Sequence, residues 1–239
     1  MGRVMRRLTA NGAIRFAIAP YEALQVASNK MTYPFNEATR VDIARRCAAF
    51  PRAAVDAAPG LKRAAVAIAL VEAERPAGEA AFVLTRRTAD LRAHRNQWAL
   101  PGGRCDKGET PAQAALREMH EEVGLELGAD AVLGLLDDYP TRSGYLITPV
   151  VVWAGKGARL APNAAEVASV HRIPLADIVT ADAFDFVTIP ESDRRVVRVR
   201  IDRHLIHAPT AAVIYQFREV LAGRTTRVAD LEQPVFAWR

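Results

Sequence analysis

The sequence has few cysteines and no long hydrophobic run, and each shortage narrows the range of proteins that it can encode. Its 239 residues include only 2 cysteines, Cys47 and Cys105, so we expect neither a disulfide framework nor a cysteine metal centre. A reducing cytoplasm is the simplest setting for such a chain. The longest apolar run, AAVAIALV from Ala64, is far shorter than the roughly 20 residues of a membrane-spanning helix. We therefore expect no membrane partner.

Lysine is also scarce, so arginine carries most of the positive charge. Lysine occurs only at positions 30, 62, 107 and 156, although Lys and Arg together number 32 against 27 acidic residues. The formal charge of +5 is too small to predict a nucleic-acid partner. Arginine suits phosphate because its guanidinium group can donate two parallel hydrogen bonds. A bias in genomic base composition explains most of the excess.

Length and composition predict one α/β (α+β) domain with an extension at each end. Half of the residues are hydrophobic and 25% are charged, which is typical of a globular domain. We predict an N-terminal extension over residues 1–35, with its disorder left open, a domain over 36–223 and a C-terminal tail over 224–239. A start at Met31 would also give a sensible protein.

Helical and strand patterns alternate along the predicted domain. Residues 37–50 are predicted as an amphipathic helix with Val41, Ala44 and Ala48 on its inner face. Residues 210–221 are predicted as another helix. Strands are predicted over 64–71, 81–85, 132–136, 147–153, 167–173 and 197–201, with a polar loop over 88–99. Because hairpins are mixed with helical crossings, we expect a mixed sheet sandwiched between helices.

A further helix is predicted to begin after Thr110. Thr110 is a favourable N-cap, Pro111 suits the first turn and Gln113 completes a capping box. Gly124 is expected to end the helix. Its apolar stripe consists of Ala112, Ala115, Met119 and Val123.

The same helix has a crowded acidic face. Glu118, Glu121 and Glu122 stand at positions i, i+3 and i+4, so their carboxylates lie together and repel one another. A hard divalent cation relieves this repulsion, and Mg²⁺ or Mn²⁺ prefers such oxygen ligands. Three glutamates alone would fit a solvated acidic face, so the loop before them decides between the two interpretations.

That loop contains Gly102 and Gly103, which allow the backbone to approach a ligand closely. Loop and helix together follow the pattern G-x₅-E-x₇-R-E-U-x-E-E-x-G-U, where U is a bulky aliphatic residue. The positions are filled by Gly103, Glu109, Arg117, Glu118, Met119, Glu121, Glu122, Gly124 and Leu125. This segment resembles the Nudix box. The resemblance implies a mixed α/β sandwich and metal-dependent cleavage of a nucleoside diphosphate linked to another group.

The resemblance also implies roles for individual residues. The implied ligands of Mg²⁺ or Mn²⁺ are the side chains of Glu118, Glu121 and Glu122 and the carbonyl of Gly103. Arg117 would hold a glutamate in place by a salt bridge, with Glu109 in support. Glu118, Glu122 and Arg117 are thus catalytic candidates. Glu166 is a further candidate, as a loop carboxylate that binds metal or activates water, although an exposed loop glutamate would be equally ordinary there.

Residues 84–103 resemble the signature of the coenzyme A pyrophosphatase subfamily, L-L-T-x-R-[SA]-x₃-R-x₃-G-x₃-F-P-G-G. The matching residues are Leu84, Thr85, Arg87, Arg92, Pro101, Gly102 and Gly103. Thr88, Asn96 and Leu100 depart from the pattern, but Asn tolerates a left-handed backbone better than most residues. Stretches at Ser143, Glu166 and His207 also look like this subfamily.

The subfamily resemblance implies that coenzyme A or its thioesters are cleaved to 3′,5′-ADP and 4′-phosphopantetheine. Arg87 and Arg92 would bind the phosphates, the 3′-phosphate included, with Gln97 and His94 as weaker candidates. The sequence leaves open free against acylated coenzyme A, the identity of the general base, and the oligomeric state, a homodimer included.

Two alternatives remain open. Pro140 lies at about the distance past the box at which the ADP-ribose subfamily places a proline, so ADP-ribose or another nucleoside diphosphate derivative is the nearest rival substrate. A non-catalytic nucleotide- or RNA-binding module is the other. Such a module is expected to have lost box glutamates, and this sequence keeps all of them.

Overall fold

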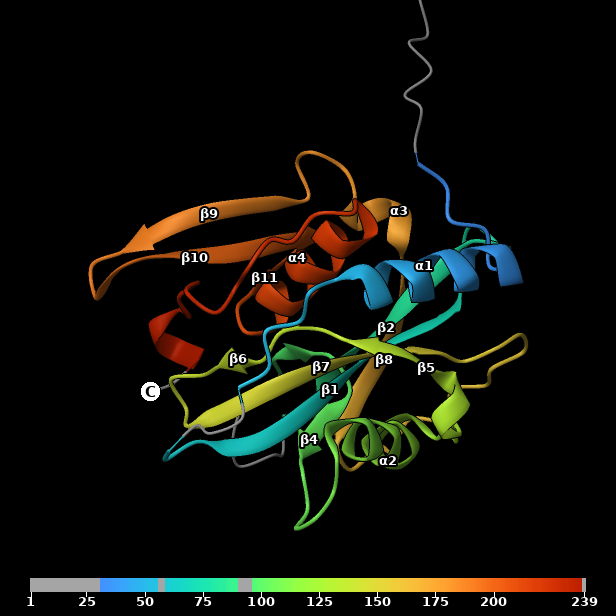
Figure 1. Ribbon diagram of the computed structural model, residues 1–239, viewed down its shortest axis with the longest axis horizontal. Coiled ribbons are helices and arrows are strands. Elements are labelled where there is room, and N and C mark those ends of the chain that lie inside the picture. Colours follow the sequence, from blue (N-terminus) through green and yellow to red (C-terminus); the bar gives the residue numbers. More distant parts are fainter. Residues whose placement is uncertain (1–30, 56–58, 90–95, 238–239) are drawn as a thin grey trace, which may run out of the picture. The chain divides into compact units, whose positions relative to one another are not determined.

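Two sheets and four helices make up the described part of the chain (Figure 1). The computed structural model describes residues 31–55, 59–89 and 96–237. Residues 1–30 of the extension that we predicted over 1–35 lie outside the described residues. The division of the chain at 35 and 223 stays a prediction. No helix among the described residues is long and apolar enough to cross a bilayer.

The larger sheet is mixed, as predicted. Its strands are β1 (Lys62–Glu72), β2 (Ala80–Arg87), β3 (Trp98–Ala99), β4 (Gly102–Arg104), β5 (Val132–Leu135), β6 (Tyr139–Pro140), β7 (Tyr145–Trp153) and β8 (Val167–Pro174). The order is β3-β2-β1-β7-β5, with β4 also paired to β1, β6 to β7 and β8 to β2. Strands β1 and β7 run parallel, while the remaining pairs of this sheet are antiparallel.

Helices cover both faces of this sheet (Figure 1). Helix α2 (Pro111–Val123) packs on one face, where a small-residue core of alanines and valines lets it approach β1 closely. Helices α1 (Glu37–Ala49) and α4 (Thr210–Leu221) lie on the other face, over a larger core that includes Phe82 and Phe217. The predicted sandwich of a mixed sheet between helices is therefore confirmed.

A second sheet of three strands was only partly predicted. It consists of β9 (Phe184–Ile189), β10 (Ser192–Ile201) and β11 (His204–His207) in the order β11-β10-β9. The predicted strand over 197–201 is the end of β10, and Val197 and Val199 are buried as its alternation indicated. The remaining short elements are α3 (Leu175–Ile178), η1 (Ala129–Ala131) and η2 (Val235–Ala237).

The predicted inner face of α1 is wrong. Val41 is 54% exposed, whereas Ile43 and Cys47 are buried in the core. Ile43 and Cys47 stand one helical turn apart and therefore share a face, and this face packs toward β5 and α4. The larger Ile and the Cys, rather than the stripe of Val41 and two alanines, thus set the orientation of the helix.

Candidate active site

Local sequence signals position helix α2 as expected. The Thr110 side chain accepts a hydrogen bond from the Gln113 backbone, and the Gln113 side chain accepts one from the Thr110 backbone. This reciprocal pair confirms the capping box. Gly124 ends the helix in the left-handed conformation with φ 68°. These signals therefore fix both ends of the helix that carries the acidic residues.

Arg117 gathers the acidic side chains around one guanidinium group. Its Nη1 donates to Glu118 Oε1 at 2.9 Å and to Glu121 Oε2 at 3.0 Å. Its Nε and Nη2 donate to the two carboxylate oxygens of Glu109 at 3.0 and 3.1 Å. These hydrogen bonds keep the pKa of Glu109 below its ordinary value. Arg117 thus orients three glutamates at once, and Glu109 is the partner that anchors it.

Glu122 is the most deeply buried of these carboxylates. It is 3% exposed, and it accepts hydrogen bonds from Gly102 N at 3.2 Å and from Arg87 Nη1 at 3.4 Å. Burial raises its pKa to about 7. Burial also raises the pKa of Glu118. In both carboxyl groups, the nearby positive charges and hydrogen bonds therefore do not fully offset the effect of burial on the ionised form.

Glu166 lies near this pair, directly before β8. Its negative charge contributes to raising the pKa of both Glu118 and Glu122, so the three carboxylates share one electrostatic environment. The backbone carbonyl of Glu166 accepts a hydrogen bond from Thr88 N at 3.0 Å. That bond ties the Glu166 segment to the end of β2, from which Arg87 extends.

The glycine loop begins with strand β4, in which the structure places the two glycines that were predicted in a loop. Both approach their neighbours closely. A Cβ at Gly103 would lie 2.2 Å from Glu118 Oε1, and a Cβ at Gly102 would lie 2.2 Å from the backbone oxygen of Ala65. Both distances are far below van der Waals contact. The backbone of Gly103 therefore lies directly against the Glu118 carboxylate, as expected if its carbonyl is to share a ligand with that group.

Among the described residues, no three His, Cys, Asp or Glu side chains are already grouped around a point that could hold a metal ion. Arg117, Arg87 and the Gly102 amide engage the carboxylate oxygens instead. The donor set nevertheless fits a hard divalent cation, because it consists of carboxylate oxygens and a carbonyl. Glu122 is buried and Glu118 is partly buried, so a cation would supply the charge that they lack.

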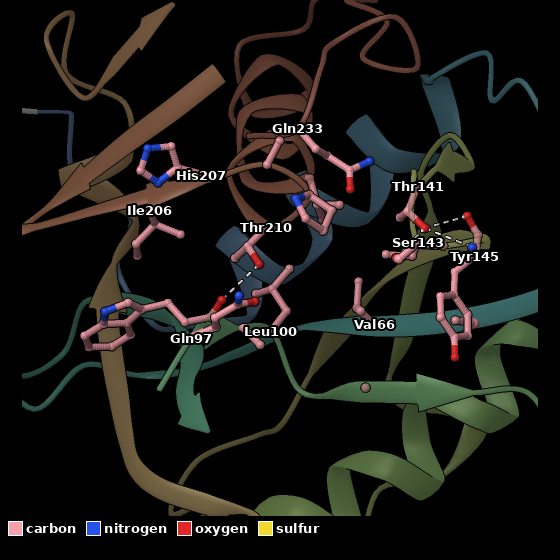
Figure 2. Close-up of a pocket in the computed structure, with 18 of the residues that line it drawn as sticks. Val66, Gln97, Leu100, Thr141, Ser143, Tyr145, Ile206, His207, Thr210 and Gln233 are labelled. Carbon is pink, nitrogen blue, oxygen red and sulfur yellow. Dashed lines mark hydrogen bonds between the residues drawn. The ribbon is translucent and has the colours of Figure 1, made fainter. Parts of the chain in front are cut away.

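A cavity of about 560 Å³ adjoins the glycine loop and is lined by Gly102, Gly103, Arg87 and Gln97. Figure 2 shows Val66 and Leu100 on one side of it and Gln233 on the other. Its volume lies within the range of ligand pockets. The cavity therefore offers room for a substrate beside the carboxylates.

The substrate-binding candidates differ in how the structure describes them. Arg87 and Gln97 line the cavity. The Nε atom of Arg87 is buried and has no hydrogen-bond partner among the described residues. Arg92 and His94 lie outside the described residues. Asn96, where the signature has glycine, adopts a left-handed φ of 57°, so the turn keeps the backbone conformation that the departure put in doubt.

Several cavity residues escaped sequence reasoning because they come from distant segments. They are Val66 of β1, Thr141, Ser143 and Tyr145 of the β6–β7 turn, Leu205 and Ile206 of β11, Thr210 of α4, and Gln233 and Phe236 near the C-terminus. The stretches at Ser143 and His207 had resembled the subfamily, but nothing in the sequence gave their side chains a role.

Comparison with known proteins agrees with this combination of a mixed α+β sandwich and a glutamate-rich helix. Residues 61–191 match the NUDIX domain family. A relative from Photorhabdus laumondii, described as an uncharacterized Nudix hydrolase NudL, is 34% identical over 66% of this chain and 84% of its own length. One from Pectobacterium atrosepticum with the same description is 34% identical over 60% of this chain and 76% of its own. The chain therefore belongs to the Nudix hydrolase family and is a hydrolase.

Solved structures of Nudix and MutT proteins show a weaker similarity to this chain. A Nudix hydrolase from M. smegmatis, RenU, is 27% identical and covers 67% of this chain and 86% of its own, with a TM-score of 0.43. A MutT protein from Methanosarcina mazei is 22% identical over 51% of this chain and 84% of its own, with a TM-score of 0.40.

Proposed function

We propose that this enzyme hydrolyses the pyrophosphate of coenzyme A or its thioesters, giving 3′,5′-ADP and 4′-phosphopantetheine. The observation that carries the proposal is the position of Arg87, an arginine of the coenzyme A signature. Its guanidinium group lines the cavity, touches Glu122 and has a buried Nε without a partner among the described residues. A phosphate oxygen in the cavity would accept a hydrogen bond from the guanidinium group of Arg87.

The metal ligands proposed here are Glu118, Glu121, Glu122 and the carbonyl of Gly103. Members of this family act on nucleotide derivatives with the help of divalent metal ions, and Mg²⁺ or Mn²⁺ suits these oxygen ligands. When bound, such an ion would neutralise phosphate charge and favour attack by water on phosphorus. Buried carboxylates with raised pKa values support this assignment, because a cation would stabilise their ionised forms.

The protein's own residues would supply the remaining steps. Arg117 keeps Glu118 and Glu121 in fixed orientations through its hydrogen bonds. Arg87 would bind a pyrophosphate oxygen and stabilise the charge of the departing phosphate. Glu118 or Glu166 would accept the proton of the attacking water at a carboxylate oxygen. No covalent intermediate is needed.

A substrate panel tests this proposal directly. The enzyme would be incubated with Mg²⁺ or Mn²⁺ and with coenzyme A, acetyl-coenzyme A, ADP-ribose, diadenosine polyphosphates and deoxynucleotides, and the products identified by mass. We expect the coenzyme A species to be the fastest substrates. Hydrolysis in ¹⁸O-labelled water should label one product only, which identifies the phosphorus that is attacked.

ADP-ribose is the second candidate substrate. Pro140 ends β6 directly before Thr141, which lines the cavity, so this rival keeps a structural basis. Turnover of ADP-ribose about a hundredfold faster than any coenzyme A species, a difference of about 2.7 kcal/mol in activation free energy, would refute the coenzyme A assignment and leave the hydrolase family intact. Action in the cytoplasm and the absence of nucleic-acid and membrane partners stay predictions.

A further inference from the structure

The C-terminal segment of the chain, residues 228–236, lines the cavity with Gln233 and Phe236, although it lies outside the stretch that matches the family. Glu232 N donates to Arg195 O at 2.9 Å and forms a bridge with Val196 of β10. Leu231 O accepts a hydrogen bond from Tyr139 OH at 2.8 Å. These contacts hold the segment between the two sheets.

An ion pair fixes this segment at one point. Arg142 donates from Nε and Nη2 to the two oxygens of Glu232, at 3.1 and 2.5 Å. Glu232 is 2% exposed, whereas the Arg142 guanidinium is half exposed. Arg142 belongs to the β6–β7 turn, and its neighbours Thr141 and Ser143 line the cavity. The ion pair thus joins two walls of the same cavity.

Gln233 and Phe236 extend from this anchor to the cavity. Figure 2 shows Gln233 and His207 across the cavity from Val66, which pairs with Gly102 of the glycine loop. The ring of Phe236 meets that of His207 edge to face, with centroids 5.2 Å apart. The C-terminal residues therefore form the wall opposite the carboxylate end of the cavity.

The chemistry of that wall suits a ligand that carries both aliphatic groups and amides. Leu205, Ile206 and Phe236 give it an apolar surface, while Gln233 and His207 supply polar atoms beside it. A pantetheine arm combines methyl and methylene groups with two amides, so it matches such a surface. The nearby Trp98 is less suited to stack on a base, because the rings of His171 and His204 lie 4.6 and 4.8 Å from its own.

We propose that residues 231–236 are a specificity element, in which Phe236 and Gln233 contact the pantetheine arm and the Arg142–Glu232 ion pair positions them. This proposal rests on the proposed function, since it assigns the two halves of coenzyme A to the two ends of one cavity. The nucleotide half lies toward Arg87 and Gln97, and the pantetheine half toward the C-terminal segment.

Product inhibition separates the two halves. Inhibition constants for 4′-phosphopantetheine and for 3′,5′-ADP would be measured with coenzyme A as substrate. In Phe236→Ala we expect the constant for 4′-phosphopantetheine and the KM for coenzyme A to rise about tenfold, with the constant for 3′,5′-ADP and kcat changed less than about twofold. Val41→Ala is the matched control, because it removes an equally exposed apolar side chain from α1.

The ion pair is tested in the same assay. Arg142→Met should reproduce the rise in KM at nearly constant kcat, because the segment loses its anchor. In Arg142→Lys, which keeps the positive charge, the rise in KM should be smaller. A merely structural role would lower the amount of folded enzyme, and thus apparent kcat, without changing either inhibition constant. Melting curves would verify that both variants are folded.

The remaining outcomes overturn the proposal in distinguishable ways. A selective loss of 3′,5′-ADP inhibition in Phe236→Ala would mean that the segment contacts the nucleotide half. Unchanged constants for both products would remove the segment from substrate binding. If no coenzyme A species is cleaved and neither product inhibits turnover of the substrate that the panel identifies, the proposed function fails, and the pantetheine assignment fails with it.

Discussion

At the scale of single residues, Glu122 combines a negative charge with nearly complete burial. Its contacts with Gly102 N and Arg87 are long, at 3.2 and 3.4 Å, and they leave its pKa raised to about 7. An acid whose pKa is higher in the folded than in the unfolded protein destabilises the fold at pH values above its ordinary pKa. The charge of Glu122 therefore lowers the stability of the folded protein, as expected if that charge serves binding or catalysis.

The substitution Glu122→Gln should separate these two effects. We expect turnover to fall at least about a hundredfold, because the change removes a ligand charge beside the pyrophosphate. Without divalent cation, the melting temperature at pH 7–8 should be unchanged or higher, because the buried charge is gone. Glu126→Gln is the control, since Glu126 is exposed just past the helix. Full activity in Glu122→Gln, or in excess chelator, would contradict the metal assignment.

Arg92 is a second test at the residue scale, although it lies outside the described residues. If its guanidinium binds the 3′-phosphate, Arg92→Ala should weaken turnover of coenzyme A by roughly 1.5–3 kcal/mol, the value of a charge-assisted hydrogen bond. Turnover of 3′-dephospho-coenzyme A should change little, since that substrate lacks the phosphate. Equal losses in kcat/KM on both substrates would assign Arg92 to the pyrophosphate or to the fold.

At the scale of elements, the glycine loop and α2 act as one unit, and two adjacent glycines test it differently. In Gly103→Ala the new methyl meets the end of the Glu118 side chain, which can move, so we expect a large loss of activity with a stable fold. In Gly102→Ala the methyl meets the backbone of Ala65 and Val66. Because this backbone cannot move aside, we expect destabilisation of roughly 1–3 kcal/mol.

Urea denaturation and turnover, measured on both glycine variants, would verify this contrast. Activity close to that of the unmodified enzyme in Gly103→Ala would mean that the Gly103 backbone and Glu118 do not act together. A Gly102→Ala variant as stable as the unmodified protein would mean that β4 can move away from β1, and the loop would then be less rigid than its pairing with β1 indicates.

Elements could be predicted from sequence where their signals are local. Helix α2 has its cap, its stop and its apolar stripe within one stretch, and the glutamate pattern depends on that helix alone. The inner face of α1 was wrong because Val41 and Ile43 are both apolar, and only the packing against β5 and α4 chooses between them. Strand β9 was missed because its residues are only half-buried, so its alternation is weak.

Prediction from local sequence signals fails for most of the cavity lining. Arg87 and Gly103 could be assigned from a signature within one stretch. Tyr145, Ile206 and Phe236 line the same cavity, but they come from segments far apart in the sequence, and only long-range strand pairing brings those segments together. No local pattern records such pairing, so the wall opposite the carboxylates could not be predicted.

At the scale of the whole molecule, the Arg142–Glu232 pair links the C-terminal segment to the larger sheet and should add stability at neutral pH that is lost in acid. Arg142 is the main cause that lowers the pKa of Glu232 from 4.5 to about 2, and Gln233 N and Ser192 contribute further hydrogen bonds. A depressed pKa adds stability above the unfolded value, and this stability is lost as the pH falls from about 5 to about 2.

Arg142→Met should therefore lower the free energy of unfolding at pH 7, by an amount that the exposure of the guanidinium group reduces. The difference from the unmodified protein should shrink as the pH falls below about 5 and be small near pH 2, where about half of Glu232 is protonated in the unmodified protein. Urea denaturation across this range measures it. Arg45→Met is the matched control, because Arg45 pairs with Asp42 on an exposed helix face, where such pairs contribute little. A difference that stays constant down to pH 2 would mean that Arg142 stabilises the segment by packing rather than by charge, and that its pairing with Glu232 does not hold the cavity wall in place.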